Sequence, residues 1–196
     1  RSMSFGSQDE WLSGVAPCPQ PAKLSKRDLD KVRENRFELT NTKADVIFAF
    51  YGYNESFAGE AGLAKFQENV AGFIQHTLAQ KYNGKAAPRL VLFSPIAHEF
   101  IDDPNLPSKE VVAASNTRLR MYSEAMRQAA KENGVKFVDL FTITKSSFNS
   151  REELAAPTPD ARVKFNPVTI NGIHLNAIGD EMVAKLTMRW FFGDPP

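Results

Sequence analysis

Three short apolar runs, separated by longer stretches with helical periodicity, place the strongest constraint on how this chain can fold. They are ADVIFAFY (44–51), RLVLFSP (89–95) and VKFVDL (135–140). Each run is rich in β-branched and aromatic residues, is apolar on both faces, and is bounded by polar or turn residues. That pattern is typical of a parallel strand that is covered on both sides. We therefore predict three buried parallel strands.

Helical patterns lie between and after these runs. Residues 60–82 repeat apolar side chains at helical spacing, which predicts an amphipathic helix. The stripe consists of Leu63, Phe66, Val70, Phe73, Ile74 and Leu78. A second helix is predicted over 108–134, beginning at Ser108 or, if the preceding segment is a loop, near Ala113. A third is predicted over 176–193, and the segment 141–175 between them is predicted to be a long loop.

The alternation of strands and helices predicts the fold class. It is α/β: a three-layer α/β/α sandwich with a parallel, flavodoxin-like sheet and right-handed crossovers. The 196 residues fit a single domain that spans 1–196. Ligands of such sheets bind at the carboxyl ends of the strands, so these ends are where functional residues are expected.

Charge and composition exclude several kinds of partner. The formal net charge is +1, with both signs spread along the chain, so neither nucleic acid nor a membrane surface is indicated as a partner. No apolar run approaches the roughly 20 residues that span a bilayer. Cys18 is the only cysteine, so no internal disulfide can form and cysteine usage does not indicate the compartment. Nothing in the pattern indicates an oligomeric state.

Asn54 follows the first predicted strand in the sequence Gly52-Tyr53-Asn54. As a turn residue it would hydrogen-bond its own backbone, which is ordinary Gly-x-Asn chemistry. As a functional residue its neutral amide would donate to a negative oxygen that develops during a reaction. Gly52 would let the backbone turn tightly beside it.

Two histidines are candidates for chemistry. His98 follows the second strand and is interpreted as a base, a substrate contact or, as we favour, a loop residue that forms hydrogen bonds. His174 lies in a loop just before the last helix, between Ile173 and Leu175. It is interpreted either as a fixed general base or as a residue that caps that helix.

Taken together, two motifs resemble the signature blocks of the SGNH (GDSL-type) hydrolase family. Gly52-Tyr53-Asn54-Glu55 resembles the family's Gly-x-Asn-Asp block, and Asn171-Gly172-Ile173-His174 resembles its Asp-x-x-His block. The segment SFGSQ, with Gly6, resembles the block whose glycine N–H helps to form the oxyanion hole. The resemblance extends from residue 1 to about residue 190.

The resemblance implies a serine ester hydrolase that cleaves small acyl esters, including carbohydrate acetyl esters, through an acyl-enzyme. His174 would be the general base, with Gly6 and Asn54 as oxyanion donors. Gly52, Glu55 and His98 become candidate contacts to a small-molecule or carbohydrate ester substrate. No metal or organic cofactor is implied, and the branch of the family that the chain resembles favours an exported protein.

The chain departs from the family pattern at the nucleophile, because no Gly-Asp-Ser block is present. We expect the serine and the sheet's central first strand to lie upstream of residue 1. Otherwise the chain is a shortened, inactive relative. Ser4 and Ser7 flank Gly6 and are the other candidates for the nucleophile.

Asn171 stands where the family has Asp, so it would orient the histidine without stabilising the imidazolium by charge. The site would then work as a Ser–His dyad, or an acid such as Glu99 or Asp160 would assist. Asn171 can also be read as a turn residue of its Asn-Gly pair. The alternative function is an inactive glycan- or ligand-binding module. A nucleotide-binding domain would require a Gly-rich phosphate loop, which the sequence lacks.

Overall fold

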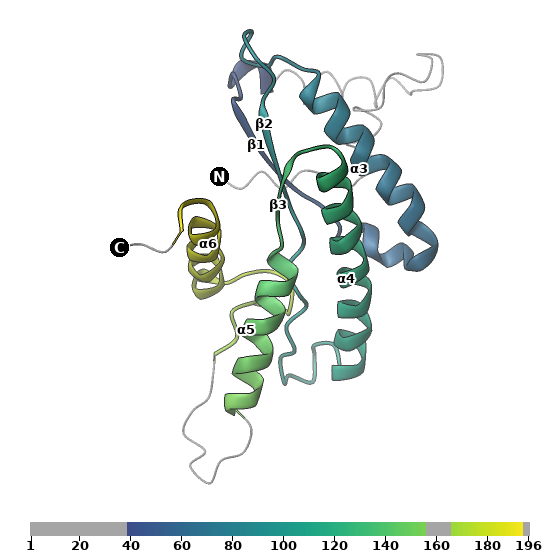
Figure 1. The fold of residues 1–196 in the computed structure, drawn as a ribbon. Coiled ribbons are helices and arrows are strands. Elements are labelled where there is room, and N and C mark those ends of the chain that lie inside the picture. Colours follow the sequence, from purple (N-terminus) through teal and green to yellow (C-terminus); the bar gives the residue numbers. More distant parts are fainter. Residues whose placement is uncertain (1–38, 156–165, 194–196) are drawn as a thin grey trace.

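Three parallel strands form an open sheet, as predicted, and their order in the sheet is β1-β2-β3. The strands are β1 (Val46–Phe50), β2 (Arg89–Phe93) and β3 (Lys136–Val138), and Figure 1 shows them in a computed structural model that describes residues 39–155 and 166–193. Phe50 is in register with Phe93, and Phe93 is in register with Val138. The three strands therefore end at one edge of the sheet.

Helices follow each strand and lie on both sides of the sheet (Figure 1). They are the 3₁₀ turns η2 (Glu55–Ala58) and η3 (Glu60–Gly62), then α3 (Leu63–Leu78), α4 (Lys109–Glu132), α5 (Leu140–Ala155) and α6 (Ala177–Phe192). Helices α3 and α4 cover one face of the sheet, and α6 lies on the other. This arrangement agrees with the predicted α/β/α class. In the described ranges, no helix is long and apolar enough to cross a membrane.

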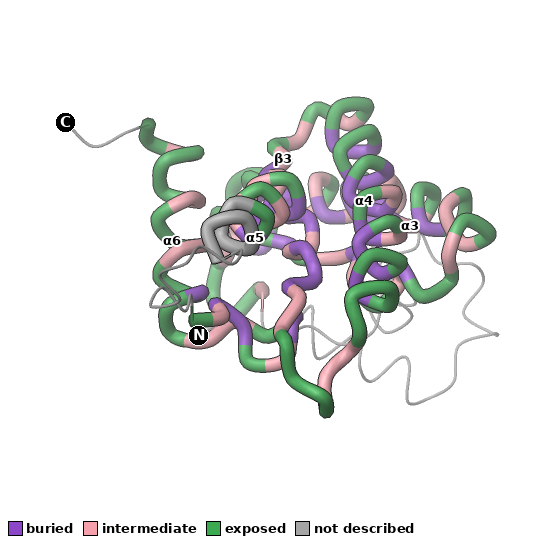
Figure 2. Tube along the Cα trace, turned by 90° about the horizontal axis from the view of Figure 1, so that it is seen from below, coloured by how far each residue is buried: buried purple, intermediate pink, exposed green. Residues whose placement is uncertain are grey.

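The larger hydrophobic core lies between the sheet and helices α3 and α4. The α3 stripe supplies Phe66, Val70, Phe73 and Ile74, each at most 3% exposed. Tyr122 and Met126 of α4 are fully buried against them. Figure 2 shows the same concentration of buried residues along the facing sides of these helices. The amphipathic pattern of residues 60–82 therefore predicted this layer correctly.

The opposite face of the sheet is covered less completely. Val183 and Phe191 of α6 pack against Val91, Phe93 and Val138, but Gly179 is the only residue of α6 that is buried. On this face β1 presents a row of side chains that are 40–57% exposed, Val46, Phe48 and Phe50, although the Phe48 ring stacks on Phe191 of α6. The prediction that the first strand is buried on both faces is wrong for this row.

Helix α4 begins one residue after Ser108, so the alternative start near Ala113 is wrong. Ser108 has extended backbone dihedrals, as an N-terminal cap residue requires. Its hydroxyl donates to the Glu110 carboxylate at 2.7 Å. At the other end, Gly134 adopts a positive φ of 67°, which terminates the helix as glycine commonly does.

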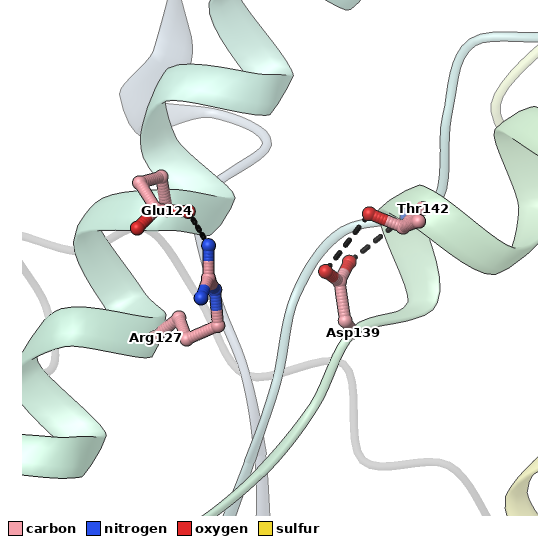
Figure 3. A network of polar contacts seen from close by, with 4 residues as sticks. All are labelled: Glu124, Arg127, Asp139 and Thr142. Atoms are coloured by element: carbon pink, nitrogen blue, oxygen red, sulfur yellow. Dashed lines mark hydrogen bonds and ion pairs between the residues drawn. The ribbon is translucent and has the colours of Figure 1, made fainter.

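The predicted loop over 141–175 is wrong in its first part, because α5 occupies residues 140–155. Asp139 starts this helix: its Oδ1 accepts from the Thr142 backbone N–H and its Oδ2 from the Thr142 hydroxyl, both at 2.9 Å (Figure 3). This is the hydrogen bond of an N-terminal cap to the third helical residue. Assigning Asp139 to the preceding strand hid that signal. Buried Phe141, Thr144 and Phe148 then hold the helix on the protein.

Replacing Asp139 by alanine is expected to lower the free energy of unfolding by about 1 kcal/mol, because it removes the cap of α5. Asp139→Asn should retain most of the stability, since an amide oxygen accepts the same bond. Glu124, which pairs with Arg127 on the exposed surface of α4 (Figure 3), is the matched surface control. Glu124→Ala should change stability by less than about 0.5 kcal/mol. Equal losses in urea unfolding for Asp139→Ala and Glu124→Ala would contradict the capping role.

Candidate active site

The segments that carry Gly52, Asn54 and His98 leave the same edge of the sheet. Because β1, β2 and β3 are parallel and in register at Phe50, Phe93 and Val138, the residues that follow each strand emerge together. Ser94 ties the last two connections to each other. Its N–H donates to the Val138 carbonyl at 3.1 Å, and its hydroxyl accepts from the Phe141 N–H at 2.9 Å.

Gly52 makes the turn that follows β1. Its φ of +101° is unfavourable for residues with a side chain, and a Cβ there would lie 3.2 Å from the Pro95 ring. Its N–H donates to the Glu55 carboxylate at 2.8 Å. Glu55 therefore closes the turn that presents Asn54.

The Asn54 side chain is exposed and has no hydrogen-bond partner among the described residues. Besides the Glu55 carboxylate, backbone bonds close the turn: the Ser56 N–H donates to the Gly52 carbonyl and the Phe57 N–H to the Asn54 carbonyl, each at 3.2 Å. In an ordinary Asn turn, the side chain would make such a bond. The amide of Asn54 is thus left available to a ligand.

His174 and Asn171 are directly hydrogen-bonded. The distance from His174 Nδ1 to Asn171 Oδ1 is 3.0 Å. Asn171 Oδ1 also accepts from the backbone N–H groups of Ile173 at 3.4 Å and His174 at 3.1 Å. Both interpretations of Asn171 are therefore realised, since it shapes the Asn-Gly turn and it orients the histidine ring.

These contacts also indicate the tautomer of the neutral ring. The backbone N–H groups of Ile173 and His174 can only donate, so the atom that faces them is the amide oxygen and not its nitrogen. An oxygen acceptor at Nδ1 requires Nδ1 to carry the proton of the neutral ring. Nε2 then has a free lone pair, which is the state a general base needs.

His174 does not cap helix α6, so that interpretation is wrong. Asn176 is the cap, because its Oδ1 accepts from the N–H groups of Ile178 and Gly179, both at 3.0 Å. Its Nδ2 donates to the Pro167 carbonyl at 2.8 Å, which joins the helix start to the incoming chain.

Glu99, from the loop after β2, braces the segment that carries Asn171 and His174. Its buried Oε2 accepts from the N–H of Thr169 at 2.9 Å, the hydroxyl of Thr169 at 2.6 Å and the N–H of Val168 at 3.1 Å. The Glu99 N–H donates to the Gly172 carbonyl at 2.8 Å, while the Gly172 N–H donates to the Thr169 hydroxyl at 3.0 Å. The carboxylate is fully engaged by these donors, whereas His174 Nδ1 pairs with Asn171. Glu99 is therefore a brace for the loop and not the acid partner of the histidine.

His98 also supports the segment that carries Asn171 and His174. Asn116 clamps its backbone, accepting from the His98 N–H and donating to the His98 carbonyl, both at 2.8 Å. The ring nitrogens are buried without a hydrogen-bond partner in the described part of the chain. The interpretation that we favoured, a loop residue that forms hydrogen bonds, therefore holds for the backbone of His98 and not for its ring. Burial lowers the pKa of His98, and the positive charge of Arg118 lowers it further.

Arg118 of α4 is a residue that the sequence reading missed, because it sits within an ordinary helical pattern. Its guanidinium carbon lies 5.9 Å from the centroid of the Phe57 ring. Burial raises the pKa of Tyr53, and the Arg118 charge partly offsets this rise. Arg118 therefore acts on both Tyr53, next to Asn54, and His98, next to Gly172.

Several residues that the sequence analysis named lie outside the described ranges. They are Ser4, Gly6, Ser7, Cys18 and Asp160. Their assignments remain predictions.

Gly172→Ala should destabilise the protein more than Gly134→Ala by about 1–3 kcal/mol, the usual range for overpacking. Both glycines have positive φ, but a Cβ at Gly172 would lie 2.6 Å from the His98 ring and 2.8 Å from the Glu99 carbonyl. Nothing lies within 4 Å of a Cβ at Gly134, so that variant isolates the backbone strain. Urea unfolding of both variants measures the difference. Adding His98→Ala to Gly172→Ala should recover part of the loss, and equal losses in the two single variants would contradict the contact.

Comparison with known proteins agrees with the resemblance. The model of the GDSL-like lipase/acylhydrolase family matches residues 24–182. No curated protein sequence is similar enough to count as a match. Among solved structures, the acetyl xylan esterase AlAXEase is 22% identical, with a TM-score of 0.51 over 84% of this chain and 74% of that one.

Two further solved structures match the chain. A mutant of Axe2, an acetyl-xylooligosaccharide esterase from Geobacillus, is 19% identical, with a TM-score of 0.50 over 86% of this chain and 68% of that one. A gut microbial diltiazem-metabolizing enzyme is 19% identical, with a TM-score of 0.49; the alignment covers 74% of this chain and 32% of that one. This chain thus spans about a third of the latter protein's length. Because the family model matches well over half of its residues, the chain belongs to the GDSL-like lipase/acylhydrolase family.

Proposed function

We propose that this protein is a serine ester hydrolase that acts on small acyl esters, with His174 as the general base. One observation carries the proposal: the Asn171 oxygen holds the exposed His174 ring in the tautomer whose Nε2 can accept a proton. Membership of the GDSL-like lipase/acylhydrolase family supports the reaction class.

In the proposed reaction, a serine hydroxyl attacks the acyl carbonyl and its proton passes to His174 Nε2. The proton then goes to the leaving alcohol as the carbon–oxygen bond of the ester breaks, which leaves the acyl group on the serine. Water, deprotonated by the same Nε2, then attacks the acyl carbon. The bond to the serine oxygen breaks, the proton on Nε2 passes to that oxygen, and the acid is released. Asn171 keeps the ring in place throughout, but its neutral oxygen stabilises the imidazolium less than a carboxylate would.

Asn54 is proposed as a donor to the oxyanion of the tetrahedral intermediate. The support is its exposed amide without a partner among the described residues, on a turn fixed by Gly52 and Glu55. Gly6 remains the proposed second donor. A rigid turn matters, because donors that are already in place cost no reorganisation when charge develops.

Carbohydrate acetyl esters are the proposed substrates. The names of two structures with a similar fold, an acetyl xylan esterase and an acetyl-xylooligosaccharide esterase, suggest this choice. We assign no serine nucleophile within residues 39–155 and 166–193. The protein as its gene encodes it is therefore the material for the tests below, and a fluorophosphonate probe followed by peptide mapping identifies the reactive serine.

His174→Ala is expected to lower kcat for p-nitrophenyl acetate by at least about a thousandfold, the scale of losing the base of such a site. His76→Ala is the matched control, because α3 carries His76 toward the edge of the sheet opposite the strand ends. Its kcat should stay within a factor of two of the unmodified protein. Full activity in His174→Ala would remove the proposal.

An outcome without hydrolysis or probe labelling, but with saccharide binding, would instead indicate the inactive binding module. The presence of Asn171 in place of the family's Asp favours this second candidate.

Asn171→Asp should raise kcat/KM, because a carboxylate in the same place stabilises the imidazolium by charge as well as by hydrogen bonding. The Ile173 and His174 N–H groups can bond the new side chain as they bond the amide oxygen. The acidic limb of the pH–rate profile should shift to higher pH, since the base holds its proton more tightly. Gln75→Glu makes the same change of charge on α3 and should change neither kcat/KM nor the acidic limb of the profile. An unchanged profile in Asn171→Asp would contradict the assigned contact.

A further inference from the structure

We propose that Arg118 binds an anionic group, a carboxylate or sulfate, on the substrate, so that the ester is carried by an acidic saccharide. The inference rests on the proposed function for the ester chemistry, but the anion site itself can be tested separately. It is built from the contacts of Arg118, Phe57 and His98.

Arg118 carries a half-buried side chain and has no charged partner among the described side chains. Its Nε is buried without a hydrogen-bond partner among the described residues. No carboxylate pairs with it among residues 39–149 and 166–193, whose side chains the structure describes. Burying part of a guanidinium group without a partner costs free energy. A carboxylate or sulfate that hydrogen-bonds to the fork of the guanidinium offsets this cost.

The nearby acidic residues are already engaged. The Glu55 carboxylate accepts from the Gly52 N–H at 2.8 Å. The Glu99 carboxylate accepts from the Val168 N–H and from both donors of Thr169. Pairing Arg118 with either of these two carboxylates would break one of these turns, so we assign its anionic partner to a ligand.

Arg118 also lies between the two segments of the candidate active site. The Phe57 ring beneath its guanidinium packs edge-on against Tyr53, with centroids 5.6 Å apart, and these two residues bracket Asn54 in sequence. On the other side, the His98 ring, which responds to the Arg118 charge, would meet any Cβ at Gly172. An anion at Arg118 would thus sit beside both Asn54 and the loop of His174.

The surroundings suit a sugar ring. Phe57 is 65% exposed, an apolar face on which the C–H face of a pyranose can pack. A guanidinium beside an exposed aromatic ring therefore favours a uronate or a sulfated sugar over a neutral one.

The kinetic test uses a matched pair of esters, 3-acetoxybenzoate and its methyl ester, which differ in the negative charge. Their ratio of kcat/KM should favour the carboxylate in the unmodified protein and fall about tenfold in Arg118→Gln, the scale of one exposed charge-assisted contact. Arg120→Gln removes the same charge from an exposed position two residues along α4 and should leave the ratio unchanged. An equal fall for both esters in Arg118→Gln, or no preference in the unmodified protein, would overturn the inference while leaving the esterase in place.

Calorimetry separates the anion site from the catalysis. Glucuronate and glucose 6-sulfate should bind more tightly than glucose, and the difference should vanish in Arg118→Gln but not in Arg120→Gln. The two anions distinguish a carboxylate site from a sulfate site. If the protein hydrolyses neither ester but still binds an anionic sugar through Arg118, the proposed function fails and the anion site stands. Equal binding of all three sugars would overturn the anion site.

Discussion

A buried carboxylate holds the candidate active site together. Glu99 lies after the central strand, yet its oxygens bind the backbone of residues 168 and 169, some seventy positions later. A carboxylate that accepts several N–H bonds is well satisfied away from water, whereas the same group without them would be costly to bury. Through this interaction, the loop of Asn171 and His174 is fixed to the edge of the sheet and is not a free connection between helices.

Several neighbouring segments together position the candidate residues. The β2 connection fixes the histidine loop through His98 and Glu99, the turn after β1 presents Asn54, and α4 supplies Asn116 and Arg118. Of the residues proposed to take part in the chemistry, Asn171 and His174 are bonded to each other directly through their side chains. Preorganisation therefore comes from residues that do not themselves perform the proposed chemistry.

The sequence predicted what depends on regular periodicity. The α3 stripe and the three apolar runs were sufficient for the parallel sheet and its covered face, and the Asn-Gly-Ile-His motif pointed to the Asn171–His174 pair. Helix α5 was missed because its start depends on one cap, Asp139, whose role is invisible until the strand is known to stop at Val138. Arg118 and Thr169 were missed because their significance lies in partners far along the chain, which no local pattern encodes.

The sparse burial of α6 has a dynamic consequence. A helix with a single buried residue contributes little to cooperativity, so its amides can exchange with solvent through local opening that spares the rest of the fold. The loop of Asn171 and His174, which precedes α6, is held separately by Glu99 and by a backbone hydrogen bond from the Ile170 N–H to the His174 carbonyl. It can therefore stay closed while α6 opens. The His174 ring therefore belongs to the part of the fold that stays closed, and fraying of the C-terminal helix leaves its orientation intact.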